Sequence, residues 1–261
     1  MKAYLEASDE TRSTARNLSA ILRNEFSSYS RSFHMLDVGC SDGDLTFSLV
    51  PGLLEMFPDF SLLGLEPEII AHGKFMGRKV RGGSIEAENL RIQEFLDRAE
   101  ARESFDYIQF VQCWYHFPRD DWGFVFDGSY SLLKRNGVMI ITLDSHSSEI
   151  YKLKDLIMEG RSDTLEYGDA FCAEDVERFL CERDIIHRTV QFPVYIHVKD
   201  DGQKLQKFAR TLAFLCRTYP EKILSGYESE ISDLLERNKR GNGYRVENLV
   251  KSLIVRKDES L

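Results

Sequence analysis

Several residues with ligand-binding chemistry lie at the end of a short, mostly apolar run that begins at residue 33, or directly after it. Residues 33–38 are mostly apolar, and two glycines occur within the next five positions. Glycines let a ligand approach the backbone, and the N-terminus of a following helix favours a negative charge such as a carboxylate. A glycine turn can also simply join a strand to a helix. The residues that we assign to ligand binding here are Asp37, Gly39, Cys40, Ser41 and Gly43.

A second acidic residue follows the next apolar run, residues 61–65. Glu66 comes directly after that run and precedes Pro67. At the end of a second parallel strand, a carboxylate can accept hydrogen bonds from both ribose hydroxyls of an adenosine ligand. A single glutamate is more often a solvated strand end, but Glu66 occurs together with the turn at Gly39 and Gly43. The combination predicts a nucleoside site, although the glycines lack the G-x-G-x-x-G spacing of nicotinamide and flavin binders.

Polar and aromatic side chains gather after the apolar run at residues 107–111. Gln112, Trp114, Tyr115 and His116 place an amide, an indole, a phenol and an imidazole there. Taken singly, the indole could pack in the core and the imidazole could bond a carbonyl. Taken together beside a nucleoside site, they predict an acceptor pocket whose aromatic faces could stabilise cationic groups. The histidines show no paired metal-ligand spacing, so we predict no metal.

Alternating strands and helices must position these residues. The apolar pattern predicts a helix at 9–26 and strands at 33–38, 61–65, 90–92, 107–111 and 138–143. Helical segments fall between the strands, which indicates a mostly parallel sheet with helices on both faces. Further along we expect a helix at 173–181, an extended stretch at 185–198, a helix at 203–219 and a closing strand at 249–255. Residues 145–170 and 199–246 would cap the carboxyl ends of the strands.

Composition limits the class of protein and of partner. The chain has 261 residues, 43 acidic and 34 basic side chains and 43% hydrophobic residues, which favours a folded domain with a net charge of −9. The excess of acid disfavours nucleic acid, because phosphate-binding proteins cluster lysine and arginine. Five cysteines without paired spacing, and no apolar run long enough for a membrane span, predict free thiols in a cytoplasmic protein without membrane contact. The oligomeric state stays open.

Four motifs resemble, in order, those of class I S-adenosylmethionine (SAM)-dependent methyltransferases. They lie at residues 36–43 (LDVGCSDG), 64–67 (GLEP), 105–108 (FDYI) and 132–138 (LLKRNGV). Ser41 stands where the commonest family pattern has a second glycine. The resemblance implies a Rossmann-like α/β sheet of about seven strands with an antiparallel last strand, and SAM as cofactor with S-adenosylhomocysteine as product. It divides the chain into an N-terminal lid (1–30), a SAM-binding core (31–145), a helical cap with the sixth strand (146–246) and a closing strand (247–261).

A closer resemblance is to the histamine N-methyltransferase-like group. Residues 105–112 and Tyr115 resemble a segment in which a glutamine contacts the acceptor, and Tyr4 and Glu6 resemble an N-terminal Tyr-x-Glu whose glutamate holds the amine. Asn248 is the nearest match to an acceptor-binding asparagine near the last strand, whereas Trp114 and His116 differ from the family. The expected acceptor-binding residues are Tyr4, Glu6, Gln112, Trp114, Tyr115, His116 and Asn248.

The implied reaction is an in-line displacement at the sulfonium methyl group by a small molecule, with an amine or imidazole nitrogen as the favoured nucleophile. An amine attacks in its neutral form, so Glu6, Tyr115 or His116 could take its proton, and Tyr115 and His116 are our catalytic candidates. The expected cofactor-binding residues are Asp37, Gly39, Cys40, Ser41, Gly43, Glu66, Pro67, Gln93, Glu94 and Gln112. O- or C-methylation, a protein acceptor, an oxidoreductase and a non-catalytic SAM-binding module are the alternatives.

Overall fold

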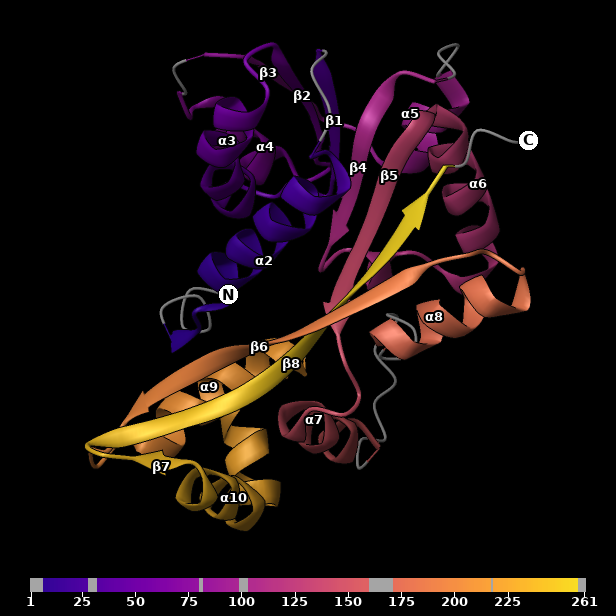
Figure 1. Cartoon of the computed structure of the whole chain (residues 1–261). Coiled ribbons are helices and arrows are strands. Elements are labelled where there is room, and N and C mark those ends of the chain that lie inside the picture. The colour runs from indigo at the N-terminus through magenta and orange to yellow at the C-terminus, as the bar shows by residue number, and fades with distance from the viewer. Residues whose placement is uncertain are drawn as a thin grey trace.

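A central sheet of eight strands organises the protein. The computed structural model describes residues 7–27, 32–79, 82–98, 103–159, 171–216 and 218–257. The strand order is β3-β2-β1-β4-β5-β8-β6, and β7 pairs with β8 (Figure 1). The strands are β1 (Phe33–Val38), β2 (Phe60–Leu65), β3 (Ser84–Glu88), β4 (Phe105–Val111), β5 (Leu133–Asp144), β6 (Arg188–Lys199), β7 (Lys239–Arg240) and β8 (Gly243–Arg256). β1 to β5 run parallel, and β8 is antiparallel to β5 and β6. The predicted α/β sheet with an antiparallel last strand is confirmed.

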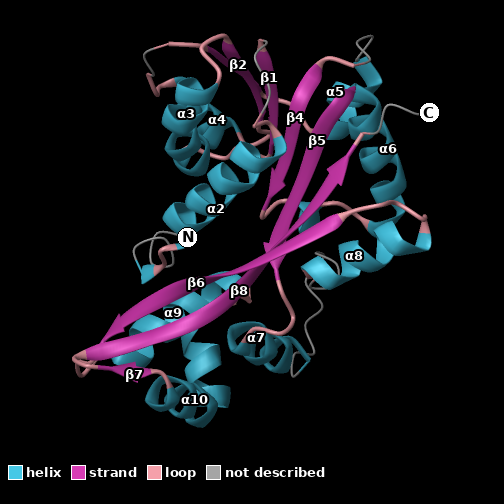
Figure 2. Ribbon diagram, in the orientation of Figure 1, coloured by secondary structure: helices cyan, strands magenta, loops and turns pink. Residues whose placement is uncertain are grey.

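Helices cover both faces of the parallel strands. α2 (Glu10–Glu25), α3 (Asp44–Met56) and α4 (Ile69–Met76) lie on one face, and α5 (Ile92–Arg98), α6 (Trp122–Leu132) and α8 (Ala173–Glu182) lie on the other (Figures 1 and 2). Met35 of β1 packs in the core with α2 and α3, whereas the next residue, Leu36, packs in the core with α6 and α8. Side chains alternate along a strand, so a strand buried between two helical layers is apolar at successive positions.

β6 and β8 continue past the carboxyl ends of the parallel strands. β6 pairs with β8 along its whole length, as far as Lys199 opposite Gly243, whereas β5 pairs with β8 only as far as Asp144 opposite Val250. α7 (Glu149–Glu159), α9 (Lys204–Leu215) and α10 (Pro220–Arg237) pack on this extension (Figure 2). We call these three helices with residues 193–199 and 243–249 the distal lobe. Its core includes Ile150, Ile196, Phe208, Leu212, Ile231 and Val246.

Some elements differ from the predicted ones. β3 is Ser84–Glu88, so the strand predicted at residues 90–92 is wrong, and Ile92 instead begins α5. β3 lies at the edge of the sheet and its side chains are exposed or half-buried, so it lacks the apolar run of a buried strand. The sequence also does not predict α10, and it places the start of the last strand later than Gly243. No helix within the described ranges is long and apolar enough to cross a bilayer.

Candidate functional site

The turn after β1 has a backbone that requires small residues. Gly39 and Gly43 have φ angles of 70° and 85°, and Ser41 between them has a φ of 52°. A Cβ at Gly39 would lie 2.8 Å from the Cβ of Cys113, and one at Gly43 would lie 2.7 Å from the ring of Phe47. Gly43 is also the residue before α3, and the first N–H groups of a helix have no partner within it. This geometry suits the ligand-binding turn expected from the sequence.

Glu66 connects this turn to the end of β2. Its Oε2 accepts a hydrogen bond from Ser41 N and its Oε1 accepts one from Glu68 N, both at 2.8 Å. Asn89 Nδ2 donates to the Glu66 carbonyl oxygen at 2.8 Å. Each carboxylate oxygen has two lone pairs, so these backbone bonds leave acceptor capacity for ribose hydroxyls. Glu66 is therefore held at the position where the sequence predicts a ribose contact, and Pro67 is exposed next to it.

Asp37 is buried beneath the same turn, with 3% of its surface exposed. Thr46 Oγ1 on α3 donates a hydrogen bond to Asp37 Oδ2. Burial raises the pKa of Asp37 to about 6, and the nearby charge of Glu66 adds to the increase against the opposing effect of its hydrogen bonds. Cys40 is buried as well, and burial raises the pKa of its thiol. Asp37 and Cys40 thus support the turn from inside the protein.

A second group of polar side chains lies where α2, β5, β8 and the end of β4 meet. Gln112 Nε2 donates to Glu10 Oε1 at 2.8 Å and to Asp144 Oδ1 at 2.9 Å. Asn248 Nδ2 donates to the same Asp144 oxygen at 2.9 Å, and Ser148 Oγ donates to Asn248 Oδ1 at 2.8 Å. We call these five residues the carboxylate–amide network. It brings two carboxylates and two amides into one hydrogen-bonded group.

Backbone contacts place the outer members of the network. Gln112 has a φ of 51°, and its backbone N–H donates to the backbone carbonyl oxygen of Thr142 in β5 at 2.9 Å. Asp9, directly before α2, makes two hydrogen bonds to the backbone of Tyr195 in β6. Its N–H donates to the Tyr195 oxygen at 3.0 Å, and its Oδ1 accepts from Tyr195 N at 2.6 Å. These bonds hold the start of α2, and with it Glu10, against β6.

The sequence predicts two members of the network, Gln112 and Asn248, and misses Glu10, Asp144 and Ser148. Asp144 ends β5 directly after an apolar run, which is the pattern that identified Glu66 after β2. That signal could have found Asp144. Glu10 has no such signal, because its position depends on how α2 packs on the sheet. The predicted residues Tyr4 and Glu6 lie outside the described residues.

The aromatic residues after β4 occupy two environments. Tyr115 and His116 belong to a short 3-10 helix, Trp114–His116, and their ring centroids are 4.6 Å apart. Tyr115 is half-buried and His116 is exposed. Trp114 is fully buried in the core, with its ring centroid 4.9 Å from that of Phe110. The structure therefore brings Tyr115 and His116 to the surface, whereas Trp114 packs under α6.

Gln93 and Glu94 lie in the first turn of α5 and not directly after a strand. Gln93 Nε2 donates to Asp121 Oδ2 at 3.2 Å, and Glu94 Oε2 accepts from the backbone N–H of Arg91 at 3.0 Å. Asn89 is the residue that directly follows β3, and its bond to Glu66 places it beside the turn. The sequence misses Asn89 because it places the third strand too late.

Comparisons with known proteins give relatives in structure only. No protein-family profile matches the chain, and no curated protein matches its sequence. A SAM-dependent methyltransferase from Archaeoglobus fulgidus has a TM-score of 0.52 at 13% identity, over 93% of this chain and 94% of that chain. A proposed sarcosine dimethylglycine methyltransferase from Galdieria sulphuraria has a TM-score of 0.51 at 16% identity, over 94% and 86% of the two chains.

Cyclopropane synthase MmaA2 from Mycobacterium tuberculosis also shares the architecture, with a TM-score of 0.51 at 13% identity over 90% of this chain and 83% of that chain. At such identities a likeness concerns the fold and not the reaction. The strand order, the antiparallel β8 and the helices on both faces agree with it. The chain therefore has the Rossmann-like fold of class I SAM-dependent methyltransferases.

Proposed function

We propose that this protein is a SAM-dependent methyltransferase. The observation that carries the cofactor assignment is the position of Glu66, whose carboxylate joins the left-handed turn after β1 to the end of β2 through two bonds of 2.8 Å. A carboxylate at this edge of a parallel sheet suits the ribose of an adenosine ligand, and the N-terminus of α3 suits the carboxylate of its methionine portion. The fold shared with the Archaeoglobus fulgidus enzyme supports the same cofactor.

The acceptor that we propose is a small molecule with an amine or imidazole nitrogen. Glu10 and Asp144 place two carboxylate oxygens within hydrogen-bond distance of one amide nitrogen of Gln112. Two carboxylates this close favour a ligand that is cationic or donates hydrogen bonds. Sarcosine and dimethylglycine, after which the Galdieria sulphuraria protein is named, are amines as well. The resemblance to histamine N-methyltransferases adds Tyr4 and Glu6 to the proposed acceptor-binding residues.

The chain's own residues would orient the acceptor and remove its proton. SAM held at the turn after β1 would supply a methyl group to the acceptor nitrogen, with the sulfur keeping the electron pair of the S–C bond. Glu10 and Asp144 would hold the nitrogen, and the amides of Gln112 and Asn248 keep Asp144 in position. Tyr115 and His116, which follow β4, are the groups that would receive the proton, directly or through water. Orientation and exclusion of water are the protein's part of the catalysis.

Calorimetric titration with SAM and S-adenosylhomocysteine tests the cofactor, with NADH and NADPH as controls. We expect micromolar binding of the two sulfur nucleosides and none of the nicotinamides. Binding of NADH alone would instead indicate an oxidoreductase. A methyl-transfer screen with labelled SAM against small amines, imidazoles, phenols and peptides then tests the acceptor. Turnover confined to phenols or peptides would contradict an amine acceptor, and SAM binding without any turnover would favour a non-catalytic module.

A further inference from the structure

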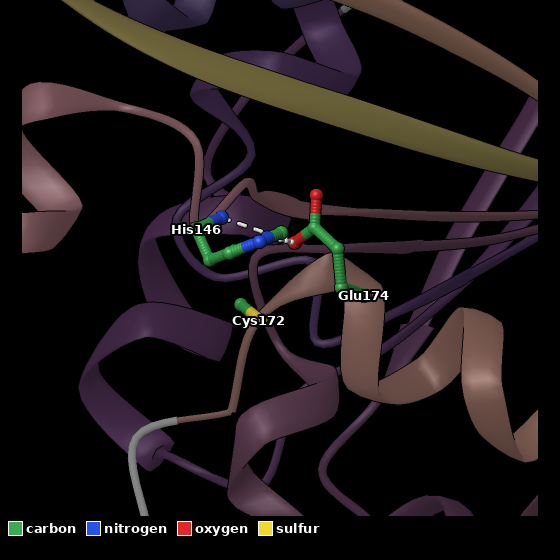
Figure 3. A group of neighbouring side chains, drawn as sticks. All are labelled: His146, Cys172 and Glu174. Carbon is green, nitrogen blue, oxygen red and sulfur yellow. Dashed lines mark hydrogen bonds and ion pairs between the residues drawn. The ribbon is translucent and has the colours of Figure 1, made fainter.

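We propose that His146, Cys172 and Glu174 form a binding site for a zinc-class divalent cation. His146 follows β5, and the other two residues lie at the start of α8 (Figure 3). Each residue offers one ligand atom, and the imidazole nitrogen, the Cys172 sulfur and a Glu174 carboxylate oxygen all lie within 4.8 Å of one another. His146 Nδ1 is 3.0 Å from Glu174 Oε2. The geometry thus brings a nitrogen, a sulfur and an oxygen ligand together from two segments far apart in the chain.

The types and separations of these atoms suit zinc. Zinc binds histidine, cysteine and carboxylate ligands tetrahedrally at about 2.0–2.3 Å, which puts neighbouring ligand atoms about 3.5 Å apart. His146 Nδ1 and Glu174 Oε2 are now 3.0 Å apart, and no two of the three ligand atoms are more than 4.8 Å apart. Small side-chain movements would therefore bring the three atoms to tetrahedral distances. The sulfur ligand disfavours magnesium and calcium, which select oxygen. His146 is 61% exposed, so a fourth position is open to water.

Glu174 would bind the cation through Oε2, and contacts to its other carboxylate oxygen, Oε1, hold the side chain in the required orientation. Oε1 accepts from Ser145 Oγ at 2.6 Å and from Lys251 Nζ at 2.8 Å, whereas Oε2 faces His146. Such contacts from outside the ligands orient a metal site. Lys251 also pairs with Glu177 at 3.0 Å, so its positive charge has a second carboxylate. A cation bound through Oε2 leaves both ion pairs of Lys251 in place.

The charges of the group match a divalent cation. Cation binding releases the thiol proton of Cys172 to solvent, so the thiolate and the Glu174 carboxylate together balance two positive charges. Cys172 Sγ donates to Asp175 Oδ2 at 3.2 Å, and this hydrogen bond is lost with the proton. Arg119 and Arg178 pair with Asp175 Oδ1 at 3.1 Å and 3.6 Å, which reduces repulsion between the Asp175 carboxylate and the thiolate.

The cation would link the loop after β5 to α8. His146 comes two residues after Asp144, and Ser148 of the same loop belongs to the carboxylate–amide network. The role that we infer is therefore structural, since the cation would hold this loop in place. The histidine spacing in the sequence predicts no metal, and it misses this site because the ligands are of three types and lie on separate segments. The inference does not depend on the proposed methyl transfer.

Calorimetric titration of the whole 261-residue chain with zinc, after treatment with a chelator, tests this site. The wild-type protein should bind zinc, and Co²⁺ should give a cobalt–thiolate absorption band in the near ultraviolet. His146→Ala and Cys172→Ser should each weaken zinc binding by at least about tenfold, and Cys172→Ser should abolish the band. Cys181→Ser, an exposed cysteine on the same helix, is the matched control and should bind as the wild type does.

Thermal unfolding gives a second measurement, which relies on substitution of the exposed residue His146 and not of the buried residue Cys172. Zinc should raise the unfolding midpoint of the wild-type and Cys181→Ser proteins, because a ligand of the folded state stabilises it. His146→Ala changes an exposed side chain, so this variant should fold and lose the increase. The proposal would be overturned if the wild-type protein did not bind zinc, if His146→Ala bound it equally well, or if the cobalt complex lacked the thiolate band.

Discussion

Glu66 Oε2 accepts the backbone N–H of Ser41 at 2.8 Å, so a side chain at the end of β2 holds the turn after β1. Ser41 has a φ of 52°, a conformation that residues other than glycine rarely adopt. Such a conformation persists only where surrounding contacts hold it. Glu66 provides one of these contacts, so the carboxylate that we propose for the ribose also shapes the turn.

Glu66→Ala should therefore weaken SAM binding. The variant would lose the two hydrogen bonds that we propose from the ribose hydroxyls to a charged group, together worth about 2–3 kcal/mol. Calorimetry with SAM measures the change. Glu55→Gln on α3, whose side chain is 75% exposed in a surface ion pair, is the control and should bind SAM as the wild type does. An unchanged affinity of Glu66→Ala would show that the ribose assignment is wrong.

Two glycine substitutions should change stability in opposite directions. Gly43→Ala places a Cβ at a φ of 85° and 2.7 Å from the Phe47 ring, so we expect a loss of about 1 kcal/mol or more in the free energy of unfolding, with weaker SAM binding. A Cβ at Gly73 in α4 meets nothing within 4 Å. Gly73→Ala should therefore stabilise the protein by about 0.5–1 kcal/mol, because alanine favours helix. Denaturant unfolding compares the two, and equal effects would contradict the strained turn.

Asp37 should make the stability of the protein depend on pH. Its pKa is raised to about 6 in the folded state from an ordinary value of 3.8, so the folded protein binds this proton more tightly than the unfolded chain does. Stability from Asp37 is thus present below pH 3.8 and is lost as the pH rises through about 6. A shift of this size corresponds to about 3 kcal/mol.

Asp37→Asn removes this titration while keeping an oxygen that accepts from Thr46. The free energy of unfolding of the variant, relative to the wild type, should rise by about 3 kcal/mol between about pH 3 and pH 7. Urea unfolding at a series of pH values measures this difference. A difference that is constant with pH would mean that Asp37 does not titrate in this range.

Glu10→Gln should impair use of a cationic acceptor without impairing cofactor binding. The substitution removes one of the two carboxylates bonded to Gln112. One charge-assisted hydrogen bond contributes about 1.5 kcal/mol, so KM for the amine should rise about tenfold. Glu221→Gln, an exposed position on α10, is the matched control. Steady-state kinetics with SAM at saturation measures KM, and a KM equal to that of the control would place the acceptor elsewhere.

Phe208→Ala should destabilise the distal lobe. Phe208 is fully buried on α9 in the core of that lobe, and truncation of a buried phenylalanine costs about 3–5 kcal/mol. Phe214 lies on the same helix but is 40% exposed, so Phe214→Ala should cost clearly less. Denaturant unfolding of both variants measures the difference. Similar losses would show that the burial of Phe208 is not what stabilises the lobe.

Local patterns in the sequence are enough to predict the parallel part of the sheet. A strand buried between two helical layers needs apolar residues at successive positions, as in β1, and a left-handed turn needs small residues such as Gly39 and Gly43. Glu66 was predictable for the same reason, since it directly follows a buried strand. β3 was not, because an edge strand needs no apolar run.

The carboxylate–amide network depends on tertiary structure. Glu10, Gln112, Asp144 and Asn248 come from α2, the end of β4, β5 and β8, and they meet because β4, β5 and β8 are neighbours in the sheet. A hydrogen bond needs its two atoms within about 3 Å, and spacing along the chain does not determine such distances. The sequence by itself therefore determined which residues end the buried strands β1, β2 and β4, whereas strand order and helix packing decided which side chains at the strand ends touch.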